Sequence, residues 1–254
     1  MTAKSVQGND LKGCSLCLLT SQYHYLDIRK QKWFKLQGFF FNIIFSKKHC
    51  MNGNHFLKIQ IRKIISEIVV KRTDLDFLNS AMESSSQAGW LLLQNETNNI
   101  AEMIDYASER QMMIAFNPAP MSEQVLRYPL DKVDLLILNE TEAAALTQNQ
   151  GIDDILSCLR DRYPNIQVVL TLGENGATYQ DSKKIIKTDS TRVEVVDTTA
   201  AGDTFIGYFI TELCHGSAIE QCMEVASLAA DKCIQRAGAS ISIPYRSEIE
   251  SVGE

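Results

Sequence analysis

Two carboxylates and a run of small residues stand close together in the segment Asp197-Thr-Thr-Ala-Ala-Gly-Asp203. Ala200, Ala201 and Gly202 are small enough to let an anion approach the main chain. An apolar helix is predicted to follow, and the free N–H groups at its start are suited to binding a phosphate. Asp203 lies at this start, where the helix dipole favours the ionised carboxylate. It could therefore act as the base that activates a hydroxyl group for phosphoryl transfer.

The same segment also has a purely structural interpretation. Asp203 would then be an ordinary carboxylate in the first turn of a helix, and Asp197 would be a turn-forming residue. The spacing of the two residues does not decide between the interpretations. The elements that surround them have to be considered as well.

An alternation of short apolar runs and helical patterns begins near Thr73. It predicts an α/β fold with a mostly parallel sheet and right-handed crossovers. The predicted strands cover residues 90–94, 112–116, 134–138, 167–172 and 193–196. The predicted helices begin near Thr97, Asn139, Gly151 and Thr204.

Ligands of parallel sheets bind at the carboxyl ends of the strands. Asn117, Asn139, Thr171 and Gly173 fall at such ends. Apolar positions on the later helices have a simpler role. Phe205 and Phe209, and the three cysteines at 214, 222 and 233, are expected to pack in the core.

Composition excludes several classes of protein. The 254 residues are 45% hydrophobic and 22% charged, as in globular proteins. The net charge of -6 gives no electrostatic reason to expect nucleic acid or an anionic membrane as a partner. No apolar run is long enough to span a bilayer. Seven irregularly placed Cys, without a signal-peptide pattern, predict reduced thiols and a cytoplasmic protein.

The charge distribution divides the chain into two parts. Residues 1–72 hold 13 Lys and Arg against 3 Asp and Glu, whereas residues 73–254 hold 12 against 28. We therefore treat 1–72 as an atypical basic segment of unknown fold and 73–254 as the domain that carries the chemistry. Within the first part, only Ile59 to Val70 has the pattern of a helix or strand.

Three interpretations of residues 1–72 remain open. A basic arm could bind nucleic acid or acidic lipid through its Lys residues and Phe39 to Phe41. A zinc site could use the C-x-x-C pair Cys14 and Cys17, although the further candidates His49, Cys50 and His55 are badly spaced. The interpretation that we prefer is a degraded or replaced N-terminal part.

Six segments of the chain carry a recognisable pattern in a fixed order. They are Leu91 to Glu96, Asn117 to Pro120, Asn139 to Ala143, Thr171 to Gly176, Asp197 to Phe205, and Arg236 to Ser240 with Ser242 to Tyr245. Together they resemble the ribokinase-like (phosphofructokinase-B) carbohydrate kinases, over roughly residues 75 to 250. An ordered match of six segments is far more specific than one motif.

The resemblance implies a three-layer fold that transfers the ATP γ-phosphoryl group to a sugar hydroxyl, with ribose as the leading substrate and ribose 5-phosphate as the product. Asp203 would be the catalytic base. The amides of Ala200, Ala201 and Gly202 would stabilise charge on the phosphoryl group. Glu96 matches the acidic residue that reaches the sugar.

The resemblance also implies sites for ATP, Mg²⁺ and K⁺. Asn139 and Glu142 would place Mg²⁺ and the phosphates through polar and water-mediated contacts. The nucleotide would be bordered by Thr171, Leu172, Gly173, Glu174 and Gly176, and its adenine by the helix near Ser227. The K⁺ site would combine Asp197 and Thr199 with main-chain oxygens near Cys233, Arg236, Gly238 and Ser242.

Residues 1–72 depart from this family. They lack its Asn-x-Asp element, its β-sheet lid and its Gly-Gly-Lys-Gly turn, so the N-terminal strands and lid are expected to be missing or replaced. We therefore expect weak or no sugar kinase activity with retained nucleotide affinity. A catalytically silent nucleotide-binding protein and a related kinase for another sugar or nucleoside remain alternatives. A homodimer is possible, although the missing lid is what pairs subunits in these enzymes.

Overall fold

The computed structural model describes residues 89–96, 98–238 and 241–250, and the backbone of three short strands before them. Its main sheet has seven strands in the order β3-β4-β5-β6-β7-β8-β9. The early strands are β1 (Tyr23–Asp27), β2 (Lys32–Leu36) and β3 (Ile43–Ile44). The later ones are β4 (Trp90–Gln94), β5 (Met113–Asn117), β6 (Leu135–Asn139), β7 (Gln167–Thr171), β8 (Ala177–Gln180) and β9 (Ile185–Thr188).

The four central strands, β4 to β7, run parallel, while the strands at both edges run antiparallel to their neighbours. The central strands are apolar on both faces, as expected for strands that are covered by helices on both sides. The predicted α/β fold with a mostly parallel sheet is thereby confirmed. The sequence analysis did not predict β8 and β9, which return antiparallel through the turn at 173–176.

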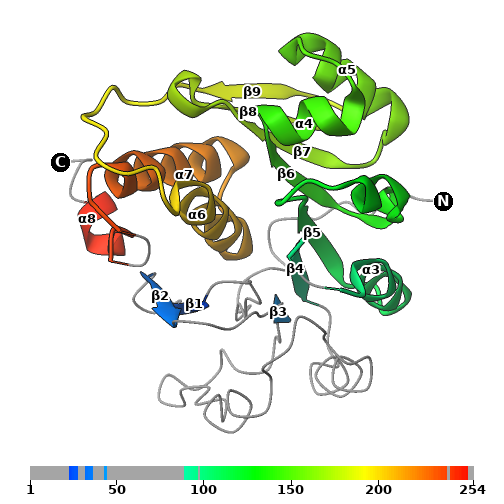
Figure 1. Ribbon diagram of the computed structural model, residues 1–254, viewed down its shortest axis with the longest axis horizontal. Helices are drawn as coiled ribbons and strands as arrows, with labels where there is room; N and C mark the ends of the chain where they lie inside the picture. The colour runs from blue at the N-terminus through cyan, green and yellow to red at the C-terminus, as the bar shows by residue number, and fades with distance from the viewer. Residues whose placement is uncertain are drawn as a thin grey trace, which may run out of the picture.

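Helices cover the two faces of the sheet, so the molecule has three layers (Figure 1). Side chains alternate between the layers along each central strand. Leu91 and Leu93 pack with the helices of one face, and Trp90 and Leu92 with those of the other. The first face carries α3 (Ile100–Glu109), α4 (Glu140–Thr147) and α5 (Ile152–Arg162). The second carries α6 (Ala201–His215) and α7 (Ile219–Ile234).

Short helical turns complete the described part of the chain. Three of them are 3-10 turns, η2 (Glu123–Arg127), η3 (Leu130–Lys132) and η4 (Gly173–Asn175). The fourth is α8 (Arg246–Glu250), which packs against α7 near the C-terminus. In the ranges that the structure describes, no helix combines the length and the apolar character needed to cross a membrane.

The α6–α7 layer is the most apolar part of the molecule. α6 is buried all round from Thr204 to Cys214, which is typical of a helix enclosed by the core. Phe205 and Phe209 stack within it, with ring centroids 6.2 Å apart. The predicted packing role of these rings and of the three cysteines is confirmed, since all of them are buried.

Two local predictions differ from the structure. Residues 193–196 do not form a strand, and Val195 and Val196 are 58% and 57% exposed. Their main chain is engaged elsewhere, since the Val196 amide donates to the Ile234 carbonyl at the end of α7. The first helix starts at Ile100, after Asn99 in the left-handed conformation. Thr97, its predicted N-cap, lies outside the described residues.

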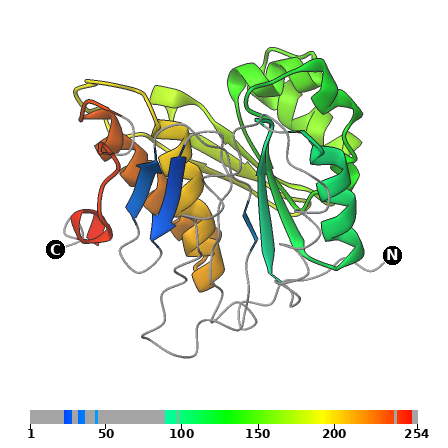
Figure 2. The ribbon, with the colours of Figure 1, turned by 60° about the horizontal axis from the view of Figure 1, so that its bottom comes forward.

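Residues 1–72 contribute three strands. β1 and β2 form a separate antiparallel pair in which Tyr23 lies opposite Leu36. β3 joins the main sheet beside β4, with Ile43 opposite Leu92 (Figure 2). Strands this short leave too little sequence for a period-2 pattern to be recognised. The proposed zinc ligands, the Phe39 to Phe41 run and the predicted element at 59–70 lie outside the described residues.

Candidate active site at the carboxyl ends of the strands

The start of α6 forms the centre of the site. Ala200 precedes the helix in a left-handed conformation with φ 66°, and Asp203 is the third helical residue. A methyl group placed on Gly202 would meet no atom within 4 Å. The Ala201 amide donates to the Thr198 carbonyl at 3.2 Å. The Gly202 amide has no acceptor within the helix, because it lies in the first turn.

Asp203 is linked to the carboxyl ends of two strands. The side-chain amide of Gln94 donates to Oδ1 of Asp203 and to Oδ1 of Asn117, both at 3.2 Å. Asn117 in turn donates to the Ile137 carbonyl at 2.9 Å. Gln94 and Asn117 are the last residues of β4 and β5, opposite one another in the parallel register. Asp203 is thus placed at the end of the sheet where ligands of such folds bind.

Sequence analysis placed Gln94 and Asn117 in two of the segments that resemble the family, and Asn117 at a strand end, but gave neither side chain a role in the site. Both side chains are almost fully buried, with 7% and 6% of their surface exposed. The signal that could have identified them is a polar residue that ends an apolar strand. Such a residue needs a hydrogen-bond partner in the core, and here the partners are part of the site.

Asn139 and Glu142 form a capping box at the start of α4. The Glu142 amide donates to Asn139 Oδ1 at 2.9 Å, and the Asn139 amide donates to Glu142 Oε2 at 3.0 Å. The Asn139 side chain also donates to Glu142 Oε1 at 3.0 Å. Burial raises the pKa of the Glu142 carboxyl, although hydrogen bonds from Asn139 and Asn117 oppose that shift. Glu142 is therefore a buried, oriented carboxyl and not a solvated one.

The loop that was expected to border a nucleotide follows β7. Thr171 lies opposite Asn139 in the sheet, Leu172 is buried, and Gly173 and Glu174 are exposed. Gly176 has φ +79°, and a Cβ there would lie 1.9 Å from the Thr188 carbonyl oxygen of β9. The close approach of β9 is thus sufficient to explain the glycine at 176.

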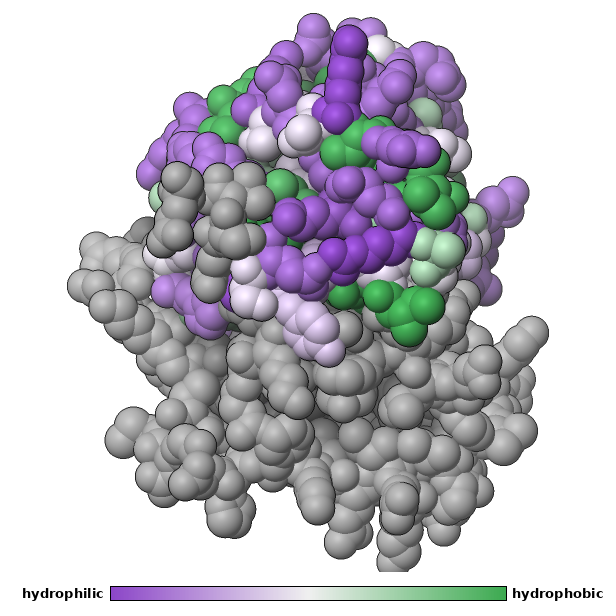
Figure 3. Space-filling view, turned by 90° about the vertical axis from the view of Figure 1, so that its left-hand side faces the viewer, coloured by the Kyte–Doolittle hydropathy of each residue, from purple (hydrophilic) through white to green (hydrophobic). Residues whose placement is uncertain are grey.

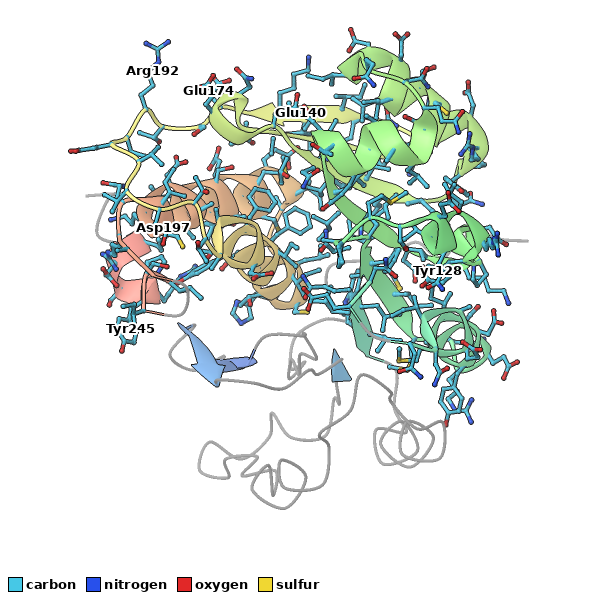
Figure 4. All side chains as sticks on the ribbon, in the orientation of Figure 1. Tyr128, Glu140, Glu174, Arg192, Asp197 and Tyr245 are labelled. Carbon is cyan, nitrogen blue, oxygen red and sulfur yellow. The ribbon has the colours of Figure 1, made fainter. Side chains whose placement is uncertain are left out.

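A cluster of polar atoms surrounds Asp197, which Figure 4 shows beside the start of α6. Its Oδ1 accepts from the Thr199 amide, and its Oδ2 accepts from the Gly238 amide, both at 2.9 Å. The Thr199 side chain and these two amides hold the pKa of Asp197 below its usual value. The structure thus brings together Asp197, Thr199 and Gly238 of the predicted K⁺ site.

Two more of the predicted K⁺-site residues complete the cluster. The Cys233 thiol lies 3.8 Å from the Thr199 carbonyl and 3.2 Å from the Ser242 hydroxyl. Arg236 directs its guanidinium to Glu248 of α8. Both Asp197 oxygens accept backbone N–H groups, and the nearby Thr199 carbonyl and Ser242 hydroxyl add two further oxygens beside the Cys233 thiol. These oxygens would suit a hard monovalent cation better than zinc or copper. In the described ranges, no group of three His, Cys, Asp or Glu side chains is placed to hold a metal ion.

The remaining predicted residues lie around this centre. Glu96 follows the end of β4 and is half-buried. Ser227 is buried on α7, in the same layer as α6. The predicted residues thus come from strand ends, from the start of α4, from α6 and α7, and from the segments that adjoin these two helices.

The comparisons with known proteins agree with this arrangement. The model of the pfkB family of carbohydrate kinases matches residues 70–246. The chain belongs to the pfkB family. Most of the chain is covered by this match, including every residue that the site combines.

The similar pfkB family members include ribokinases. A ribokinase of Lactococcus lactis is 31% identical over 178 residues, which cover 69% of this chain and 57% of that protein. A ribokinase of Bacillus subtilis is 31% identical over 193 residues, covering 74% of this chain and 64% of that protein. The chain thus spans about six tenths of the length of these curated relatives.

Solved structures of pfkB family members share the fold. The structure of Arabidopsis thaliana ribokinase complexed with ribose and ATP superposes with a TM-score of 0.61 at 25% identity. The superposition covers 72% of this chain and 60% of that one. The three-layer ribokinase-like architecture predicted from the sequence is confirmed by this likeness.

Proposed function

We propose that this protein transfers the γ-phosphoryl group of ATP to a hydroxyl group of a sugar. The observation that carries the proposal is the position of Asp203, whose carboxylate lies in the first turn of α6 beside the open space at Gly202 and is held by Gln94. A base next to amides that can receive a phosphate is the arrangement that phosphoryl transfer requires. Membership of the pfkB family supports the same reaction.

In the proposed reaction, Asp203 accepts the proton of the attacking hydroxyl as its oxygen forms a bond to the γ-phosphorus. The bond from that phosphorus to the β,γ-bridging oxygen breaks, and ADP leaves. The Gly202 amide and the positive end of the α6 dipole stabilise the charge on the phosphoryl oxygens. Gln94 fixes the carboxylate through its hydrogen bond to Oδ1.

Two cations fit the residues present. Carboxylate and amide oxygens suit Mg²⁺, and those of Glu142 and Asn139 lie at the ends of β6 and α4. Both Glu142 oxygens already accept hydrogen bonds from Asn139, so we assign this pair an indirect, water-mediated role. K⁺ would be held near Asp197 and Thr199. Bound cations of this kind neutralise charge on the phosphates and on the turn beside them.

We propose ribose as the sugar, and its primary hydroxyl as the acceptor. The support is the ribokinase identity of the two relatives described above. Turnover is expected to be weak, because residues 1–72 lack the sugar-binding elements typical of the family. A cytoplasmic location, expected from the irregular cysteines, and a homodimer both remain predictions.

The departure of residues 1–72 favours a second candidate, a silent nucleotide-binding protein that retains the fold. Calorimetry separates the two. A silent protein gives heat on addition of ATP with Mg²⁺ and no further heat with ribose. A kinase gives additional heat with ribose and releases ADP.

The Asp203→Asn variant tests the role of the carboxylate directly. Asn keeps the size of the side chain but cannot take the proton, so we expect ribose-dependent ADP release to fall at least about a hundredfold. ATP affinity should change little. Asp153→Asn is the matched control, because Asp153 is an exposed first-turn carboxylate of α5. Equal rates in the two variants would contradict the proposal.

A further inference from the structure

The segment 189–200 connects β9 to the start of α6 without a strand or an α-helix of its own. Figure 1 shows it as the long yellow connection that passes the end of α7 on its way to α6. Arg192 on this segment points away from the molecule in Figure 4. The shape of such a segment depends on the contacts it makes with its neighbours, since no ladder of backbone hydrogen bonds holds it.

Asp231 holds the first part of this segment. It lies in the last turns of α7 and is 6% exposed. Its Oδ1 accepts from the Ser190 hydroxyl at 3.0 Å, and its Oδ2 accepts from the Thr191 amide at 2.8 Å. Hydrogen bonds to an ionised carboxylate are stronger than those between neutral groups. Asp231 therefore anchors the segment where it leaves the sheet.

The end of α7 supports the rest of the segment. The Ile234 carbonyl accepts from the amides of Val196 and Asp197, at 2.8 and 3.1 Å. The Cys233 thiol lies 3.8 Å from the Thr199 carbonyl. The contacts thus run in order along the segment, from residue 190 to the residue before Ala200, which caps α6.

We propose that Asp231 is a positioning residue for the anion-binding turn at 200–203. It acts at a distance, because it fixes the start of the segment whose other end forms that turn. The inference rests on the proposed function in so far as the turn binds the phosphates of ATP. Residues 191, 192 and 194–196 of the segment are all exposed, so its described contacts come from the end of α7 and the residues after it, with Asp231 holding the part nearest the sheet. In Figure 3 the coloured part of this face is mainly hydrophilic, with several hydrophobic patches among the polar residues.

The test compares three variants of the full chain. Asp231→Ala removes both hydrogen bonds, and Asp231→Asn keeps an acceptor for Ser190 but not a second one for Thr191. The matched control is Glu212→Gln. Glu212 is also a buried carboxylate, and it accepts from Ser217 at 2.8 Å and pairs with Arg246 at the far end of α6. The Glu212→Gln variant shows what happens when the hydrogen bonds of a buried carboxylate are weakened elsewhere in the same layer.

Two measurements are made on each variant: amide hydrogen exchange of peptides covering 190–203, and ATP affinity by calorimetry with Mg²⁺. Relative to the wild type, Asp231→Ala should raise the amide exchange rate in 190–203 more than in β6 and β7. It should also bind ATP about tenfold more weakly than the wild type. Asp231→Asn should lie between it and the wild type. Glu212→Gln should lower the thermal midpoint but leave ATP affinity within about twofold.

Unchanged exchange in 190–203 of Asp231→Ala would overturn the proposal. So would an equal loss of ATP affinity in Asp231→Ala and Glu212→Gln. If the wild type binds no ATP, the proposed function fails by itself, and the exchange measurement still decides whether Asp231 holds the segment. If Asp231→Ala does not fold, the graded effect of Asp231→Asn on the same two measurements decides.

Discussion

The Asp203 side chain is oriented by residues that are distant in sequence. It lies in the first turn of α6, and Gln94, more than one hundred residues earlier, donates a hydrogen bond to its carboxylate. Gln94 is itself bound to Asn117, so the Asp203 carboxylate is connected to two adjacent strand ends. This carboxylate is therefore positioned by the parallel sheet as well as by its own helix.

Gly202 allows the phosphate-binding role of this turn to be separated from its structural role. In Gly202→Ala the new methyl group meets no protein atom within 4 Å, so the fold should tolerate it. Alanine should even stabilise the helix, by about 0.5–1 kcal/mol. A phosphate at the turn would be obstructed, and we expect ATP affinity to fall about tenfold or more. Urea unfolding and calorimetry measure the two effects; unchanged affinity would argue against phosphate binding here.

Glu142 gives the fold a pH dependence of known sign. Burial raises the pKa of its carboxyl, so the folded state favours the protonated form. The stability that Glu142 contributes in this way is fully present below the pKa of 4.5 that the group has in the unfolded chain. It is lost as the pH rises through the higher pKa of the folded state. Glu142→Gln, a neutral mimic, should therefore gain stability relative to the wild type between pH 4 and pH 8.

Urea unfolding at several pH values checks this expectation. Glu140→Gln is the control, because Glu140 is the exposed carboxylate of the same first turn. It should show no such trend. If the difference in free energy of unfolding between Glu142→Gln and the wild type were the same at every pH, Glu142 would not titrate as its burial implies.

At the scale of elements, the β7–β8 turn contains a matched pair of glycines. Gly176→Ala would place a Cβ 1.9 Å from the Thr188 carbonyl oxygen, so β9 has to move. We expect a loss of about 3 kcal/mol from this overlap and the positive φ together. Gly173→Ala meets no atom within 4 Å and should lose only about 1 kcal/mol, because of its φ of +56°. Similar losses in urea unfolding would contradict this.

The elements differ in how well their sequences predict them. The central strands could be predicted because burial on both faces requires continuous apolar runs. β8 and β9 could not, since they are short and follow a glycine turn that reads equally well as a loop. Residues 193–196 have the composition of a strand, but their main chain meets the end of α7 and not another strand. Whether such a segment becomes a strand depends on whether another strand pairs with it, and the composition of the segment does not reveal that.

The site shows the same division. The residues near 139 and 171 could be predicted as neighbours, because strand ends of a parallel sheet converge. Residues 197–203 are joined to them by the family resemblance, since no strand precedes them in the structure. Gln94 and Asn117 could not be assigned, since their hydrogen bonds to Asp203 and to one another exist only in three dimensions. The roles of all these residues remain predictions that the variants above test.

At the scale of the whole molecule, the sheet separates two cores, and the one beneath α6 and α7 holds three buried thiols. Burial raises the pKa of Cys222 to about 12. Cys158, on the other face, is partly exposed. At pH 8 we expect iodoacetamide to modify Cys158 at least about a hundredfold faster than Cys222. Peptide mass spectrometry measures both rates, and comparable rates in the native protein would show that the α6–α7 core opens readily.

The pairing of β3 with β4 limits how far the protein can be shortened from its N-terminus. On the outer edge of β4, Leu91 and Leu92 pair with a strand that lies thirty residues before the change in charge at residue 73. A fragment that starts at 73 would leave this edge unpaired and free to join another copy, which promotes aggregation. We therefore expect the shortest fragment that stays monodisperse in gel filtration to begin before residue 43.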